Sequence, residues 1–254
     1  MWLVLCLESD AAALWAHAEL GRQGLKPLEL VTDRHLAGAT WDHRVDGSGV
    51  RTRVALADGR SIDSDRVTGA LNRFFALPPR LLADVEPADF EYAAGEMSAL
   101  VVSWLAGLGR RAINPSGTRG LAGAWRSSAE WAALAAEAGM PASPVIIGEE
   151  PRYAPDGWHA WPPLAMVPED VIVVGRAVFA RRRLGERLRL ACHRLAELSE
   201  TPLLGLRFAT DVRGNGRRYG GRRLAAVTPL PDLRAGGHDL VVALADELRA
   251  VAAP

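Results

Sequence analysis

Apolar residues recur along the first third of the chain with two different periods. Continuous or alternating apolar runs predict strands at 2–7, 28–32 and 67–74, and a hairpin of 41–45 with 50–56 about Gly47-Ser48-Gly49. Helical spacing predicts helices at 10–23 and 87–108. Ser9 is the expected N-cap of the first helix, and Gly24 marks its end. Strands that alternate with helices predict an α/β domain over residues 1–111.

The second part of the chain predicts a different order of elements. Strands are expected at 112–115, 145–147 and 171–180, and a hairpin pairs 203–209 with 224–229 through Gly214-Asn215-Gly216. Helices are expected at 127–138, 184–198 and 240–251, and Ser127 with Glu130 has the spacing of a capping box. Residues 149–168, rich in proline and tryptophan, predict a long irregular connection.

Composition narrows the class of protein. Formal net charge is zero and no apolar run is long enough to cross a membrane. The first residues lack the basic start of a secretory signal, so we expect a cytoplasmic protein. Cys6 and Cys192 are expected to be buried thiols, and no metal-binding spacing of His and Cys is present. Lys26 is the single lysine, which with abundant alanine indicates a high-GC bacterial genome.

Three segments stand out: Ala70-Leu71-Asn72-Arg73, the run from Asn114-Pro115 to Ala138-Gly139-Met140-Pro141, and the hairpin at 203–229. Together they resemble the ATP-grasp superfamily, and within it the ligases that modify ribosomally synthesised peptides. In the same resemblance, residues 170–180 look like the strand pair that precedes the helix at 184–198. The resemblance implies an α/β fold in which a pre-ATP-grasp-like domain (1–111) precedes a reduced ATP-grasp-like α+β domain (112–254). The reduced domain is expected to lack the lid subdomain, because only about one loop fits between Ile147 and Asp170.

The same resemblance predicts a lost metal site. In the family, one strand of the last pair supplies an Asp and the next carries Glu-x-Asn-Pro, and these side chains hold the magnesium ions of ATP. Arg207, Ala226 and Thr228 stand at the three positions here. Magnesium requires oxygen ligands, so we expect no metal and no MgATP cofactor.

Other polar residues are candidate ligand-binding groups. The full candidate set is Asn72, Arg73, Asn114, Arg119, Arg126, Arg207, Asp232 and Arg234. Arg119 and Arg126 are the cations nearest to the position of a missing family lysine. One interpretation of Asp232 and Arg234 is a ligand loop. The other, which is favoured, is that they pair with each other or cap the final helix. Trp158 and Trp161 are candidate partner-binding anchors, or pack locally on the sheet.

These observations favour a non-catalytic ATP-grasp-like protein that binds a peptide or protein partner in a ribosomal-peptide or natural-product pathway. The alternative is a divergent ligase or other enzyme in which Arg73, Arg119, Arg126, Arg207 and Arg234 converge around an anionic ligand. A nucleic-acid module is the weaker third hypothesis, since net charge is zero. Removal of a lid would expose sheet edges and apolar surface, which favours a homodimer.

Overall fold

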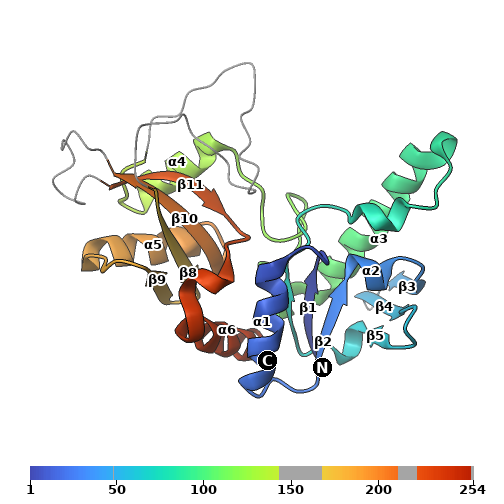
Figure 1. The fold of residues 1–254 in the computed structure, drawn as a ribbon. Coiled ribbons are helices and arrows are strands. Elements are labelled where there is room, and N and C mark those ends of the chain that lie inside the picture. The colour runs from blue at the N-terminus through green and yellow to red at the C-terminus, as the bar shows by residue number, and fades with distance from the viewer. Residues whose placement is uncertain (48, 143–167, 211–221, 253–254) are drawn as a thin grey trace. The chain divides into compact units, whose positions relative to one another are not determined.

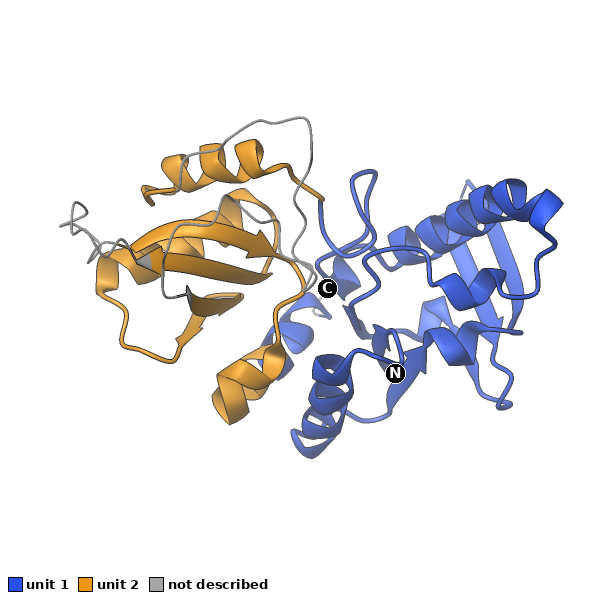
Figure 2. Ribbon diagram, turned by 45° about the horizontal axis from the view of Figure 1, so that its top comes forward, with its two compact units in different colours: residues 1–124, 245–254 blue, residues 125–244 orange. Residues whose placement is uncertain are grey.

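The computed structural model describes residues 1–47, 49–142, 168–210 and 222–252. The chain forms two compact units, one of residues 1–124 with 245–254 and one of residues 125–244 (Figure 2). The second division falls inside the last helix, α6 (Gly237–Val251). The strand at 112–113 completes a sheet of unit 1, while the domain boundary at 111/112 stays a prediction.

Unit 1 is built on a parallel sheet with strand order β2-β1-β6-β7 (Figure 1). These strands are β1 (Trp2–Cys6), β2 (Leu28–Thr32), β6 (Gly69–Asn72) and β7 (Ala112–Ile113). Helix α1 (Ala11–Arg22) makes the crossover from β1 to β2, and the short α2 (Asp33–Leu36) follows β2. Asp10 caps α1 by accepting a hydrogen bond from the backbone N–H of Ala13, so the prediction of Ser9 as N-cap was wrong.

A second sheet of unit 1 is antiparallel, with the order β3-β4-β5. It consists of β3 (Thr40–Asp46), β4 (Gly49–Ala55) and the unpredicted β5 (Ser61–Asp63). Helix α3 (Phe90–Leu108) packs against β4, and the Trp104 ring meets that of Trp41 edge to face at 5.1 Å between centroids. A common core joins both sheets to the second half of α3. Short 3₁₀ helices lie at Ser64–Arg66, Pro79–Leu82, Pro87–Asp89 and Gly109–Arg111.

Unit 2 is built on one antiparallel sheet with strand order β11-β10-β8-β9. Its strands are β8 (Pro168–Val174), β9 (Ala177–Ala180), β10 (Leu203–Thr210) and β11 (Arg222–Thr228). Periodicity predicted one strand at 171–180, whereas the resemblance implied a strand pair, and the pair is present: Gly175, at a φ of 53°, turns the chain between β8 and β9. A non-glycine residue adopts that backbone conformation at a cost, so glycine favours the turn there.

Two helices cover one face of the unit 2 sheet. Trp131 and Ala135 of α4 (Ser128–Glu137) and Cys192 and Leu195 of α5 (Glu186–Leu198) share a core with Phe208 of β10. The predicted capping box is confirmed, since Ser127 and Glu130 exchange side-chain to backbone hydrogen bonds at the start of α4. A 3₁₀ turn, η6 (Leu233–Gly236), precedes α6. Residues 145–147, the connection at 149–167 and the glycine-rich turn at 214–216 lie outside the described residues.

Candidate functional site

The three positions expected to bear metal ligands lie side by side on β10 and β11. In the antiparallel ladder Arg207 stands opposite Ala226, and Gly205 stands opposite Thr228. The register shifts between Arg207 and Phe208, which makes a bulge beside the arginine. The sequence therefore predicted the neighbourhood of these residues correctly.

Arg207 lies on the face of the sheet away from α4 and α5. Its neighbours Leu206 and Phe208 belong to the core under those helices, and side chains alternate along a strand. The Arg207 guanidinium donates to Asp170, which is opposite it on β8, with 2.8 Å between Nε and Oδ1. A cation and a carboxylate thus occupy the place where the resemblance expected an acid and a metal ion.

The two β11 positions offer little to a metal ion. Ala226 contributes a buried methyl group, and the buried Thr228 hydroxyl accepts a hydrogen bond of 3.1 Å from the backbone N–H of Leu230. Within the part of the chain that the structure describes, no group of three His, Cys, Asp or Glu side chains is placed to hold a metal. At these three described positions a guanidinium, a methyl group and one hydroxyl stand where the resemblance expects carboxylate and amide oxygens, which are the ligands that magnesium prefers.

Asn72 and Arg73 lie in unit 1, at the carboxyl end of β6. The Asn72 amide donates to the Leu121 carbonyl at 2.6 Å and accepts from the Phe74 N–H at 3.1 Å. Arg73 donates from Nε to Oδ2 of Asp10 at 2.7 Å, and its side chain is 4 % exposed. Asn72 thus connects the end of β6 to Leu121, and Arg73 connects it to the start of α1.

Acidic residues missed in the sequence surround this edge of the parallel sheet. The Glu8 N–H donates to Oδ1 of Asp33 at 2.6 Å, and Arg80 forms ion pairs with both Glu8 and Asp33. The edge lies where β2 and β6 flank β1, the position at which open α/β sheets bind ligands. Burial and the nearby Asp10 raise the pKa of the Cys6 thiol to about 12. Acids placed directly after β1 and β2 were the signal that the sequence offered for this cluster.

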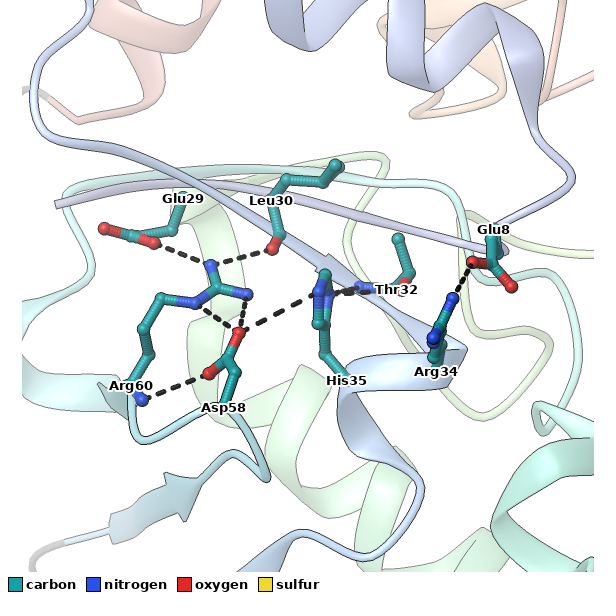
Figure 3. A network of polar contacts seen from close by, with 8 residues as sticks. All are labelled: Glu8, Glu29, Leu30, Thr32, Arg34, His35, Asp58 and Arg60. Atoms are coloured by element: carbon teal, nitrogen blue, oxygen red, sulfur yellow. Dashed lines mark hydrogen bonds and ion pairs between the residues drawn. The ribbon is translucent and has the colours of Figure 1, made fainter.

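A second polar network ties β2 to the loop after β4 (Figure 3). Arg60 donates to Glu29 at 2.8 Å and to the Leu30 carbonyl at 3.1 Å, and it pairs with Asp58. Hydrogen bonds from Arg60 lower the pKa of the Asp58 carboxyl, and His35 lies 3.9 Å from that carboxylate. Arg60 thus joins two carboxylates and a backbone carbonyl of neighbouring segments, which indicates a structural role.

The remaining candidate residues are divided between the two units. Asn114 is buried at a φ of 53°, and Arg119 is exposed in the turn 117–120 of unit 1. In unit 2, Arg126 donates to the Ser199 carbonyl at 3.0 Å and stacks over the Trp131 ring, 5.7 Å from its centroid. Arg126 is therefore on the helix side of the sheet, while Arg207 is on the other side. These two guanidiniums do not share a pocket.

Asp232 and Arg234 pair with each other, with 2.7 Å between Nη2 and Oδ2. Asp232 also caps η6 through the Arg234 N–H. The pairing is the interpretation that the sequence favoured, while the capped element is η6 and not the final helix. Trp158 and Trp161 lie outside the described residues, so their role as anchors stays a prediction.

A hollow of about 250 Å³ lies on the open face of the β3-β4-β5 sheet. Its lining alternates between Arg44, Arg51 and Arg53 and the acids Asp42, Asp63 and Asp65. Arg44 pairs with Asp42 at 3.2 Å and Arg51 with Asp65 at 3.8 Å. No predicted site residue lines it, and its mixed charges do not select an anion.

Comparison with known proteins identifies the fold. No protein-family model matches the sequence, and no curated protein matches it. The solved structure of macrocyclase MdnC bound with precursor peptide MdnA from Microcystis aeruginosa MRC superposes with a TM-score of 0.73 at 9 % identity, covering 98 % of this chain and 99 % of that one. A RiPP-associated ATP-grasp ligase of Chryseobacterium gregarium, in complex with ADP and a leader and core peptide, gives 0.70 at 9 % identity, covering 100 % and 97 %. ATP-grasp ligase PsnB, complexed with minimal precursor, Mg and ADP, gives 0.67 at 15 % identity, covering 99 % and 97 %.

These similarities confirm the expected fold: the chain has an α/β ATP-grasp-like architecture, similar to that of ligases that modify ribosomally made peptides. At such low identity they establish the fold alone. The absence of a lid stays a prediction, because residues 143–167 lie outside the described part of the chain. Among the described helices, none is long and apolar enough to cross a membrane.

Proposed function

We propose that this protein is a non-catalytic ATP-grasp-like protein that binds a peptide partner in a pathway of ribosomal-peptide modification. Solved structures with its fold hold a precursor peptide or leader and core peptides, which supports a peptide as the partner. The fold thus supports a peptide as the ligand. Whether the protein also uses MgATP depends on the residues at the three positions expected to bear metal ligands.

The observation that carries the proposal is the Arg207–Asp170 ion pair opposite Ala226. Phosphoryl transfer depends on positioned cations that neutralise the phosphate oxygens, and magnesium supplies most of that charge in this class of reaction. Here the local carboxylate is already neutralised by a guanidinium, and the next strand presents a methyl group. These described positions therefore offer no set of oxygen ligands for the magnesium ion that a ligase of this class uses.

Isothermal titration of MgATP and MgADP into the full-length protein tests the non-catalytic part. We expect no saturable heat and no ADP release in the presence of peptide. The triple variant Arg207→Asp, Ala226→Glu, Thr228→Asn is the matched control, because it returns oxygen donors to three adjacent ladder positions. Binding of Mn²⁺, followed by its paramagnetic resonance signal, is expected in the triple variant and not in the wild type. Tight MgATP binding with turnover by the wild type would refute the proposal.

Fluorescence anisotropy tests the peptide part, with labelled peptides made from the short reading frames beside the gene. Saturable binding by the wild type, unaffected by added MgATP, is the expected result. Binding that requires MgATP would instead favour the alternative of a divergent ligase.

A further inference from the structure

The β3-β4-β5 sheet of unit 1 presents one face to the core and the other to solvent. Trp41, Val54 and Ile62 belong to or pack against the core that the sheet shares with α3. Side chains alternate along a strand, so the residues beside these three point to the open face. The charged residues that line the hollow on that face are Asp42, Arg44, Arg51, Arg53, Asp63 and Asp65. Their positive and negative charges are equal in number.

Two arginines of this face stand directly opposite each other in the sheet. Arg44 of β3 is the ladder partner of Arg51 of β4, and like charges in this position destabilise an antiparallel pair. Arg44 pairs with Asp42 on its own strand, with 3.2 Å between Nε and Oδ1. Arg51 lies 3.8 Å from Asp65, which is beyond hydrogen-bond distance. The sheet therefore keeps a charge arrangement that does not favour its own pairing, and such exceptions are typical of functional surfaces.

Arg53 of the central strand β4 lies between two acids and pairs with neither of them. It is opposite Asp42 of β3 and also opposite Asp63 of β5. Asp42 accepts from Arg44 instead. The Asp63 carboxylate accepts the backbone N–H of Asp65 at 3.0 Å. Among the residues that the structure describes, neither Arg53 nor Asp63 has an ion-pair partner, so the hollow offers one cation and one carboxylate on neighbouring strands.

We infer that this hollow binds an extended peptide segment whose acidic and basic side chains are two residues apart, with the carboxylate on Arg53 and the ammonium group on Asp63. Side chains i and i+2 of an extended segment point to the same side and are about 6.7 Å apart. Opposite residues such as Arg53 and Asp63 are about 5 Å apart at Cα, and their side chains are long enough to cover the difference. A guanidinium binds a carboxylate through two parallel hydrogen bonds, which favours an acid at this position. This site rests on the proposed function, since a peptide is the partner proposed there, and it adds the chemistry of one segment of that peptide.

The lining disfavours other classes of ligand. Its aspartates repel a polyphosphate, and its arginines repel a metal ion. At about 250 Å³ the hollow is also smaller than the roughly 300–1,000 Å³ of pockets that enclose drug-sized ligands. A short segment with both signs of charge matches its size and its charges.

NMR spectroscopy of the isotopically labelled full-length protein tests this site with short blocked peptides. The probe is acetyl-Glu-Ala-Lys-amide at millimolar concentration, because each exposed ion pair contributes little binding energy. It is expected to give saturable shifts of the amide signals of β4 and β5, weakened by raised salt. The single-sign peptides acetyl-Glu-Ala-Glu-amide and acetyl-Lys-Ala-Lys-amide are expected to bind at least about fivefold more weakly, because their second charge meets a like charge.

Two variants link each side chain of the hollow to one side chain of the probe. Replacement of the probe's Glu by Gln is expected to weaken binding to the wild type at least about threefold and to leave binding to Arg53→Gln unchanged. Replacement of the probe's Lys by Gln is expected to weaken binding to the wild type equally and to leave binding to Asp63→Asn unchanged. Asparagine keeps a side-chain oxygen for the Asp65 N–H, so the start of the 3₁₀ helix that follows β5 is preserved.

Arg110→Gln and Asp84→Asn are the matched controls, because both are exposed positions of unit 1 outside the hollow. Both are expected to bind the probe as the wild type does. A wild type without saturable shifts in β4 and β5 overturns the assignment, and so does equal binding of the mixed and the single-sign peptides. Inorganic phosphate that shifts the same signals at the same concentration would identify a simple anion site and would also overturn it.

The longer labelled peptides of the anisotropy experiment separate this site from the proposed function. If the wild type binds none of them, the proposed function fails. If they bind the wild type, Arg53→Gln and Asp63→Asn equally well, the proposed function stands and the assignment of the hollow is overturned.

Discussion

Each unit of the molecule contains an arginine–aspartate ion pair beside its sheet, and the two pairs differ in burial. In unit 1, Arg73 and Asp10 meet at 2.7 Å with side chains 4 % and 19 % exposed. In unit 2, Arg207 and Asp170 meet at 2.8 Å with side chains 28 % and 46 % exposed. The same two chemical groups are thus placed in two different dielectric environments.

Burial decides what each pair does. Charges removed from water depend on each other, because neither can recover its hydration if the partner is lost. An exposed pair exchanges with water and contributes little to folding. Arg73 is therefore a structural residue at a typical ligand position, and Arg207 is a residue whose removal is expected to cost little folding free energy.

The largest expected effect follows from removal of the buried arginine. Arg73→Met leaves Asp10 in a mostly buried site without its cation, and we expect the free energy of unfolding to fall by about 3–5 kcal/mol. Equilibrium unfolding in urea measures the loss. The double variant Arg73→Met, Asp10→Asn removes both charges and is expected to recover part of it. A loss below about 1 kcal/mol would show that this pair behaves like an exposed one.

Each unit contains one buried cysteine, so thiol labelling can report opening of each unit separately. Burial raises the pKa of both the Cys6 and Cys192 thiols to about 12, so roughly one thiol in ten thousand is ionised at pH 8 and alkylation of the native protein is slow. Arg73→Met is expected to speed labelling of Cys6 by roughly a hundredfold through local opening, while Cys192 is unchanged. Mass spectrometry of the two cysteine peptides reads both rates. Equal acceleration at both sites would show that the two units open together.

A smaller effect is expected at the exposed pair. Arg207→Met leaves Asp170 partly hydrated, so the free energy of unfolding is expected to change by no more than about 1 kcal/mol. Urea unfolding of this variant beside Arg73→Met is the direct measurement, and Asp170→Asn is its partner control. A loss as large as that of Arg73→Met would mean that the Arg207–Asp170 pair is needed for folding.

Local signals explain what the sequence predicted well. The capping box of Ser127 and Glu130 and the glycine stop at Gly139 depend on neighbours within one turn, and both are present. The proximity of Arg207, Ala226 and Thr228 followed from hairpin register, which two adjacent strands largely fix. Between Ser9 and Asp10, adjacent residues of similar capping ability, the sequence offered no basis for choice.

Long-range pairing explains what the sequence did not predict. Asp170 faces Arg207 because β8 and β10 pair in a particular register, although 37 residues separate the two. Asp10 meets Arg73 because parallel strands bring their carboxyl ends to one edge, across 63 residues. An arginine that the sequence marks as a ligand group can therefore already be neutralised by a distant acid. Periodicity also does not tell which side of the sheet Arg126 and Arg207 occupy. The sequence alone therefore could not show that these two residues do not share a pocket.

Glu247 of α6 is the opposite case, because the pKa of this half-buried acid is shifted by burial and not by an ion pair. Desolvation raises the pKa of its carboxyl above the ordinary 4.5. A raised folded-state pKa means that the folded protein holds the proton more tightly than the unfolded chain. The stability linked to this group is therefore complete below pH 4.5 and is lost as pH rises through the folded pKa.

Glu247→Gln is expected to raise the free energy of unfolding slightly at neutral pH and to leave it unchanged below pH 4.5, measured by urea unfolding across pH. Asp246→Asn, which breaks an exposed pair with Arg249, is the control and is expected to give no gain. A gain from Glu247→Gln that persists in acid would assign the effect to packing instead of charge.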